Sequence, residues 1–321
     1  MIGQGPFSCS DRPQAGEETF YFNDFRLQNA TPWLRPAQII SVEALSLPEP
    51  CTLSLALDPP SSSAFSQVFD AISQDILAGK IQKSVPVACE TGVVEEADKR
   101  QLLSNALAHQ STGWLYGFYH PECSFFGHSP ELLFSAKNRQ LNTMALAGTA
   151  RRDEIEVFQM DEKEIREHEY VVNYIMSQLS EFGEAVRHPR GVKPLGEIAH
   201  FHSPIEVQLD KDQDWNEIMK VMHPTPALGP LPRQTTSLND LMRWRAELDC
   251  PTVFGAPFGY YDGHEFTSVV SIRGVHWEAD QLTIPAGCGI IEASRLTSEW
   301  RELRLKRQAI KDAFLLRNLE A

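Results

Sequence analysis

The 321-residue sequence lacks the patterns that mark secreted, membrane-anchored and nucleic-acid-binding proteins. No run of 18 apolar residues occurs, and the opening "MIGQGPFSCSDRPQAG" has no positive segment followed by an apolar core, so a cytoplasmic protein is expected. There is no Lys/Arg-rich run, and the formal net charge is −14, which argues against a general nucleic-acid binder. An anionic small substrate would therefore need a locally basic pocket.

The cysteines also follow no recognisable pattern. None of the six belongs to a CxxC pair, so the sequence suggests neither a zinc knuckle nor a disulfide framework, and we expect reduced thiols. The six positions are Cys9, Cys51, Cys89, Cys123, Cys250 and Cys288.

What the sequence does contain is an ordered series of strand-like and helical stretches, with 42% hydrophobic residues for a core. Helices are expected at residues 64–79, from 163 onward, at 215–222, at 236–248 and at 298–319. Strands are expected at 19–25, 51–57, from 83, 113–120, 123–129, 131–146, 192–201, 204–210, 254–262, 266–278 and 282–291. Because the strands occur in adjacent groups, we predict an α/β fold of the α+β type, one domain over residues 1–321 with large antiparallel sheets.

The helix that begins with "KEIREHEYVV" carries two acids in an unusual place. At 100° per residue, Glu164 and Glu167 lie on the same side as Val171, Ile175 and Leu179, so the carboxylates continue the apolar stripe. The expected closing helix repeats this arrangement. Its acids Glu299 and Glu302 are close in angle to Leu303, Ile310 and Phe314. Acids in a first helical turn can simply offset the helix dipole, but that does not explain the inward angle in both helices.

Four buried carboxylates that stay ionised need a cation. Without histidine or cysteine neighbours, they favour a hard, oxygen-preferring ion such as Mg²⁺ over zinc. Lys306, one turn beyond Glu302 on the same face, adds a positive charge suited to an anionic ligand. A surface salt bridge between Lys306 and Glu302 is the alternative interpretation.

Nine stretches together resemble the chorismate-utilising enzymes, which include isochorismate, salicylate and anthranilate synthases. In chain order they are "KSVPVA", "GHSPELLF", "TMALAGTARR", "EIREHEYVV", "HPTPALG", "GAPFGYYD", "VSIR", "AGCGII" and "SEWRELRLK", spanning about residues 80 to 306. The first 60 residues match none of the family's stretches and form a shortened N-terminal part. The resemblance implies two large face-packed sheets flanked by helices. It also implies a Mg²⁺ site in which Glu167 and Glu302 are direct ligands, supported by Glu164 and Glu299.

The resemblance also assigns catalytic roles. Lys83 occupies the place of the lysine that acts as general base on water in the isochorismate- and salicylate-forming members, where the aminating members carry glutamine. Ala147 stands where the aminodeoxychorismate-forming members have a nucleophilic lysine. Glu131 in "SPELLF" matches the general acid that protonates the departing C4 hydroxyl. Lys83 would need a lowered pKa to accept a proton at neutral pH.

The remaining implied residues would bind the substrate, chorismate. Tyr260 and Arg273 would grip the enolpyruvyl carboxylate, His200 would lie near the leaving hydroxyl, and backbone amides would assist. The substrate-binding set implied by the resemblance is Gly148, Thr149, His200, Tyr260, Arg273, Gly287, Cys288, Gly289 and Lys306.

These residues predict a Mg²⁺-dependent isochorismate synthase, an isomerase without a glutamine amidotransferase partner. A salicylate synthase is the alternative, because it uses the same lysine and acid and then eliminates pyruvate. An anthranilate-synthase-type enzyme and an inactive chorismate-binding protein are less favoured. The sequence departs from the family at Pro86, Ala88, Pro230 and Cys288, but no proposed catalytic group is lost. Both menaquinone and siderophore formation consume isochorismate and fit the prediction.

Overall fold

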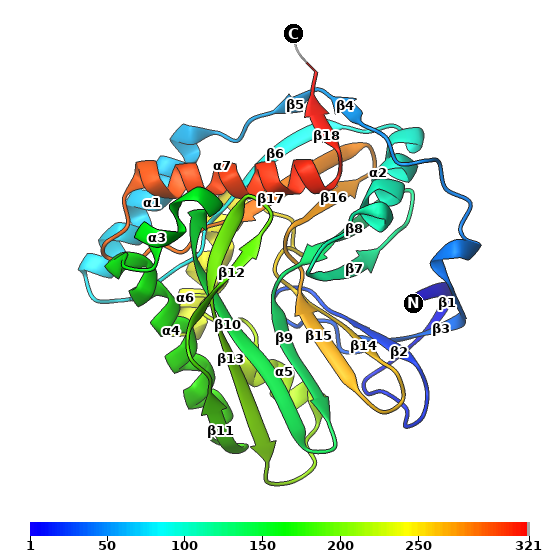
Figure 1. Cartoon of the computed structure of the whole chain (residues 1–321), viewed down its shortest axis with the longest axis horizontal. Coiled ribbons are helices and arrows are strands. Elements are labelled where there is room, and N and C mark those ends of the chain that lie inside the picture. The colour runs from blue at the N-terminus through cyan, green and yellow to red at the C-terminus, as the bar shows by residue number, and fades with distance from the viewer. Residues whose placement is uncertain (320–321) are drawn as a thin grey trace.

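The computed structural model, which describes residues 1–319, contains two antiparallel sheets packed face to face (Figure 1). The larger sheet has ten strands in the order β1-β3-β2-β14-β15-β9-β10-β13-β11, with β12 also paired to β13. Its strands are β1 (Ile2–Ser10), β2 (Thr19–Phe22), β3 (Trp33–Ile40), β9 (Leu132–Lys137), β10 (Gln140–Arg151), β11 (Gly183–Arg187), β12 (Gly191–Leu195), β13 (Ile198–Leu209), β14 (Pro257–Tyr261) and β15 (Phe266–Val270).

The smaller sheet has six strands in the order β5-β6-β17-β16-β8-β7. These are β5 (Leu57–Asp58), β6 (Val87–Val93), β7 (Trp114–Phe118), β8 (Cys123–Ser129), β16 (Gly274–Glu278) and β17 (Gln281–Gly287). Tyr116 and Phe125 of this sheet pack in one apolar cluster with Leu132, Met144 and Val269 of the larger sheet. The predicted pair of face-packed antiparallel sheets is therefore confirmed.

Helices cover the outer surfaces of the sheets. They are α1 (Ser62–Leu77), α2 (Glu96–Ala108), α3 (Ile155–Phe158), α4 (Glu162–Leu179), α5 (Trp215–Met222), α6 (Thr235–Glu247) and α7 (Leu296–Ala313), with short 3₁₀ turns at Val42–Ala44 and Arg152–Glu154. Helix α4 packs along β10, β13 and β11, whereas α7 packs on β17 and β6 and also reaches β10 and β13 (Figure 1). The N-terminal ends of α4 and α7 therefore approach each other where the two sheets meet.

Helix α4 begins where its sequence provides a cap. The side chain of Asp161 accepts hydrogen bonds from the backbone amides of Lys163 and Glu164, which satisfies donors that the first turn leaves free. The buried stripe contains Val171, Ile175 and Leu179, as the periodicity predicts. Each such side chain stabilises the fold by about 1.5–3 kcal/mol when fully buried, so the register of the helix is strongly specified. That register fixes the direction of the acids one turn earlier.

The first 60 residues contribute more structure than the sequence suggests. Strands β1, β3 and β2 form one edge of the larger sheet, and β2 pairs with β14. Strand β4 (Leu53–Leu55) pairs in parallel with β18 (Leu316–Asn318), close to the end of the chain. The N-terminal part thus completes both the large sheet and a contact with the last strand.

Several element predictions are wrong in detail. The stretch 192–201 is not one strand, because a turn at Gly196 and Glu197 separates β12 from β13, and β13 continues through 204–209. The stretch 266–278 is not one strand, because the chain leaves the larger sheet after Val270 and enters the smaller sheet at Gly274. The closing helix ends at Ala313 instead of residue 319, since Leu315 adopts a positive φ of 53° and β18 follows. Helix α2 was not predicted, because its buried face includes polar residues such as Ser104 and Asn105.

None of the helices in residues 1–319 combines the length and the apolar character needed to cross a bilayer.

Candidate active site

A cavity lies where the two sheets meet the N-terminal ends of α4 and α7. Nine of the residues predicted for the site line this cavity, and three of the predicted acids line a larger cleft directly outside it. The nine are Glu131, Gly148, Thr149, Glu167, His200, Arg273, Gly287, Gly289 and Lys306. The acids of the outer cleft are Glu164, Glu299 and Glu302. Thr149 lines both spaces, so the cavity and the cleft are neighbours.

Lys83 is fully buried and is not itself among the cavity-lining residues, but it lies against two of them, Glu167 and Gly289. It precedes β6 instead of beginning a strand, and its backbone exchanges hydrogen bonds with Leu231 in the proline-rich loop. Its ammonium donates a hydrogen bond to Oε1 of Glu167 at 3.0 Å. A Cβ added at Gly289 would come within 2.6 Å of Lys83 Cε and 2.1 Å of Glu167 Oε1, so only glycine fits beside this pair.

Glu131 lies in the short connection between β8 and β9, where the two sheets are joined. Its backbone is held in place because Val270 N donates to Glu131 O, and the Ser129 hydroxyl donates to Val270 O at 2.6 Å. Burial raises the pKa of Glu131 to about 7, although Lys83, Lys306 and Arg273 oppose the shift. A carboxyl group that is half protonated near neutral pH suits a general acid.

Arg273 reaches the cavity from the point where the chain crosses between the sheets. Its backbone φ is 59°, a left-handed conformation that ends β15 and turns the chain toward β16. Burial lowers the pKa of Arg273 to about 10, and it stays positively charged at neutral pH. A buried guanidinium at this place can bind a carboxylate through two parallel hydrogen bonds.

His200 on β13 holds this arginine. Arg273 donates from Nη2 to Nε2 of His200 at 2.6 Å, so Nε2 carries no hydrogen. The hydrogen is therefore on Nδ1, which donates to the carbonyl oxygen of Gly148 at 2.6 Å. Burial, with Arg273 and Lys306 nearby, lowers the pKa of His200 well below its ordinary value, which keeps the ring neutral. Gly148 has a φ of 75° and interrupts the pairing of β10 with β13.

Thr149 and Lys306 hold the second acid of α7. Glu302 Oε1 accepts a hydrogen bond from the Thr149 hydroxyl at 3.0 Å and lies 2.6 Å from the Lys306 ammonium. Lys306 also donates to the carbonyl oxygen of Gly287 at 2.8 Å. The salt bridge of the alternative interpretation is thus present, but it is not on the surface, because Glu302 is buried and both residues line the site.

Two predicted substrate contacts are not brought to the cavity. Tyr260 lies toward the far end of β14, where its hydroxyl donates to the carboxylate of Glu18, and the aromatic side chain at the cavity is Phe254. The backbone amide of Cys288 donates to the carbonyl oxygen of Pro86 at 3.3 Å, so it is not free for a ligand. The family motifs assigned Tyr260 and Cys288 to the substrate site, but the strand pattern did not show which end of β14 approaches the cavity.

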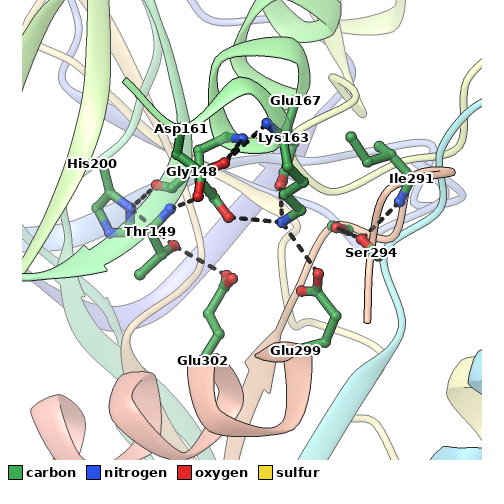
Figure 2. Close-up of polar contacts among 12 residues, drawn as sticks. Gly148, Thr149, Asp161, Lys163, Glu167, His200, Ile291, Ser294, Glu299 and Glu302 are labelled. Atoms are coloured by element: carbon green, nitrogen blue, oxygen red, sulfur yellow. Dashed lines mark hydrogen bonds and ion pairs between the residues drawn. The ribbon is translucent and has the colours of Figure 1, made fainter. Parts of the chain in front are cut away.

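The sequence analysis missed the cation that lies among the acids. Figure 2 shows the ammonium of Lys163 linked to Glu167 of its own helix and to Glu299 of α7. Its nitrogen is 2.9 Å from Glu167 Oε2, 3.0 Å from Glu164 Oε1 and 3.2 Å from Glu299 Oε1. The four-residue spacing from Lys163 to Glu167 in "KEIRE" was the available signal.

The four acids fit a hard cation in their chemistry, although no group of three or more His, Cys, Asp or Glu side chains within residues 1–319 is arranged to hold a metal as it stands. Glu299 is 1% exposed, and its Oε2 accepts no hydrogen bond. Burial and neighbouring carboxylates raise the pKa of Glu164 to about 8 and that of Glu299 to about 7. Burial alone would raise the pKa of Glu167 too, but Lys163 and Lys83 hold it below its ordinary value. The four carboxylates of the cluster therefore have too few positive charges beside them.

A buried acid, a buried lysine, a buried arginine and an acidic cluster surround one cavity, an arrangement typical of an enzyme site. Comparison with known proteins identifies the family. Residues 33–315 match the family described as "Chorismate binding enzyme", and the chain belongs to that family of enzymes.

The relatives are consistent with this membership. The chain is 28% identical over 258 residues to the salicylate biosynthesis isochorismate synthase of Pseudomonas aeruginosa, covering 77% of this chain and 53% of that protein. It is 26% identical over 302 residues to isochorismate synthase EntC of Escherichia coli, covering 89% of this chain and 73% of that protein. The chain thus spans about half the length of the first of these relatives.

A solved structure shows the same fold. The crystal structure of a putative 2,3-dihydroxybenzoate-specific isochorismate synthase, DhbC, from Bacillus anthracis superposes with a TM-score of 0.76 at 20% identity, covering 92% of this chain and 84% of that one.

Proposed function

We propose that this enzyme converts chorismate reversibly to isochorismate. The observation that carries the proposal is that Glu131, whose pKa burial raises to about 7, lines the cavity, while the fully buried Lys83 is hydrogen-bonded to Glu167 of the same lining. A base and an acid beside one cavity suit a reaction that adds water at one ring carbon and removes a hydroxyl from another.

In the proposed reaction, Lys83 takes a proton from water, and the water oxygen forms a bond to C2 of the ring. Both ring double bonds shift by one position, from C1–C2 and C5–C6 to C1–C6 and C4–C5, and the C4–O bond breaks. Glu131 gives its proton to the departing hydroxyl, which leaves as water, so atoms and charges balance. In the structure the Lys83 nitrogen donates a hydrogen bond to Glu167, so it has to turn from this contact toward the water before it can act as a base.

The other cavity groups would bind the two carboxylates of the substrate. Arg273 would hold the enolpyruvyl carboxylate, with His200 fixing the orientation of the guanidinium through the hydrogen bond to Nε2. Lys306 would add positive charge next to the cavity. Because the chain as a whole carries an excess of acids, this local group of cations is what permits a dianion to bind.

The expected Mg²⁺ would be held by the carboxylates of Glu164, Glu167, Glu299 and Glu302, and it would neutralise the ring carboxylate of chorismate. Support comes from the unpartnered Oε2 of Glu299 and from the raised pKa of two of the acids. We further propose one catalytic domain over the whole chain, a cytoplasmic enzyme, and no glutamine amidotransferase partner.

The experiment is to incubate the protein with chorismate and Mg²⁺ and to separate the products by chromatography. Isochorismate as the sole product supports the proposal. Salicylate with pyruvate would show that the alternative, a salicylate synthase, is correct. Anthranilate formed in the presence of ammonia would contradict both, and no product would indicate a binding protein.

A variant pair tests the role of Lys83. Lys83→Ala should lose nearly all turnover, whereas Lys80→Ala, which removes an exposed lysine paired only with Asp75, should keep it. Unchanged turnover in Lys83→Ala would show that another group is the base.

A further inference from the structure

Lys163 lies where the acids of two helices converge. It comes from the first turn of α4, and its nitrogen contacts Glu164 and Glu167 of that helix as well as Glu299 of α7 (Figure 2). Its side chain is 15% exposed. The lysine is thus the direct link between the two halves of the acidic cluster, whose acids belong to helices about 135 residues apart in sequence.

The ammonium is also located at the boundary between the inner cavity and the outer cleft. Glu167 lines the cavity, whereas Lys163, Glu164 and Glu299 line the cleft. A ligand of the acids would therefore occupy the space that the ammonium fills. Beyond it, the cleft is also lined by Asp161 and Glu154, which could pair with a lysine that moves outward.

The charges explain why a cation is present there. Burial alone would lower the pKa of Lys163, but Glu167, Glu299 and Glu164 raise it well above its ordinary value, so the side chain is charged. Together with Lys83, which contacts Glu167, the lysine sets two positive charges against three carboxylates, and Glu299 Oε2 accepts no hydrogen bond. Buried carboxylates without compensation are costly, and a divalent ion would compensate them better than an ammonium.

We propose that Lys163 is a built-in cation that occupies the place of the divalent metal in the metal-free protein and withdraws into the outer cleft when the metal binds. This inference rests on the metal site of the proposed function. A Mg²⁺ ion takes oxygen ligands at about 2.0–2.1 Å, so it cannot share these carboxylates with an ammonium lying among them. The repulsion between the two cations adds to the steric conflict.

This arrangement affects both affinity and stability. Without metal, the lysine neutralises part of the acidic cluster and holds α4 to α7. When metal binds, the lysine has to be displaced first. The apparent metal affinity is therefore the intrinsic affinity multiplied by the fraction of molecules in which the lysine leaves the site free. The lysine therefore weakens metal binding and stabilises the empty enzyme.

The first test compares Lys163→Met with Arg166→Met. Both remove one positive charge from α4, but Arg166 is exposed and pairs with Glu292 outside the site. Mn²⁺ alone serves as the probe, and its binding is measured by electron paramagnetic resonance with a calorimetric check for Mg²⁺. We expect Lys163→Met to bind Mn²⁺ about tenfold more tightly than the wild type, and Arg166→Met to change affinity less than about twofold.

Equal or weaker binding in Lys163→Met would overturn the inference, since the lysine would then not compete with the metal. The outcome also separates this inference from the proposed function. If neither protein binds Mn²⁺ but the wild type still turns over chorismate, the metal site itself is wrong. If both bind Mn²⁺ equally, only the role of Lys163 is wrong.

A second measurement uses thermal unfolding without metal. Lys163→Met should unfold at a lower temperature than Arg166→Met, and saturating Mg²⁺ should raise its midpoint more than that of the wild type. An equal midpoint for the two metal-free variants would contradict the stabilising role of the lysine.

A third measurement needs no variant. The wild-type protein is treated with an amine-acylating reagent, with and without saturating Mg²⁺, and acylation of Lys163 is quantified by mass spectrometry against that of the exposed Lys80. We expect Mg²⁺ to increase the labelling of Lys163 relative to Lys80. Protection that persists at saturating Mg²⁺ would show that the lysine does not withdraw.

Discussion

The two halves of α7 both carry buried charges, but the charges have different surroundings. The first half presents Glu299 and Glu302 to the outer cleft. The second half presents Arg307 and Lys311 to Glu90 of β6, with Lys311 Nζ 3.1 Å and Arg307 Nε 3.7 Å from its carboxylate oxygens. These contacts lie between helix and sheet, and none of the three residues lines the cavity or the cleft.

The difference shows how to distinguish functional from structural buried charges. At the second half, Arg307 and Lys311 share the carboxylate of Glu90 away from the cavity and the cleft, so the cluster binds the helix to the sheet. At the first half, carboxylates outnumber cations, two of the acids have raised pKa values, and there is space for a ligand. Perturbed acids beside a cavity indicate a functional site. Changing each end of the helix should therefore affect different properties.

The largest expected effect is at the cavity. Glu131→Gln removes the proposed proton donor and should lower the turnover number by about 10²–10⁴, the usual contribution of general acid catalysis, while leaving the unfolding midpoint nearly unchanged. The rate is measured with saturating chorismate and Mg²⁺. A loss of less than about tenfold would assign the acid role to another group.

The next effect concerns the opposite end of α7. Glu90→Gln leaves Arg307 and Lys311 buried without their carboxylate, which should lower the free energy of unfolding by about 3–5 kcal/mol. Urea unfolding measures this loss. Turnover of the folded variant should stay close to that of the wild type.

The matched control on the same helix is Asp312→Asn. Asp312 is an exposed partner of Arg317, so its replacement should change stability by less than about 1 kcal/mol. If the folded Glu90→Gln variant loses turnover, the two ends of α7 are not independent, and the comparison fails.

A smaller effect is expected on the pH dependence of stability without metal. Glu299 and Glu131 have folded-state pKa values of about 7, and Glu164 of about 8, all above the unfolded value near 4.5. The native protein therefore binds more protons than the unfolded chain, and stability should fall as the pH rises from about 6.5 to 8.5. Buried histidines with lowered pKa values act in the opposite direction, but only below their unfolded value of about 6.5.

The variant Glu299→Gln isolates this contribution. Its unfolding free energy should fall less steeply over the same pH range than that of the wild type, and Mg²⁺ should stabilise it less at the upper end. Parallel curves for the two proteins would mean that Glu299 does not take up a proton in the folded state.

The smallest effect is expected at a residue that the resemblance placed in the site. Tyr260→Phe removes a hydroxyl that contacts Glu18 and not the cavity, so kcat/KM for chorismate should change less than about threefold. A loss above about thirtyfold would show that Tyr260 reaches the substrate after all.

The sequence predicted the parts of the site that depend on local periodicity. The acids of α4 and α7 were found because the helical stripe alone determines which way they point. The family motifs found Lys83 and Glu131, although their full burial depends on packing between distant strands. Arg273 was expected in the site, but its positive φ was not predicted. Arginine rarely adopts this conformation, and the sequence pattern indicates one continuous strand across residue 273.

Two features could not be predicted for related reasons. Lys163 resembles an ordinary surface lysine within its helix, and only the approach of Glu299 from α7 makes it central. Tyr260 and Phe254 lie close together in sequence, and the choice between them depends on which end of β14 meets the cavity. Both are tertiary effects that no single stretch of sequence contains.

Isotope labelling tests the central claim most directly. The protein is incubated with chorismate and Mg²⁺ in water enriched in ¹⁸O, and the product is analysed by mass spectrometry at early times. Addition of water at C2 predicts isochorismate with one ¹⁸O atom in its ring hydroxyl. Unlabelled isochorismate, or salicylate with pyruvate as the early products, would contradict the account.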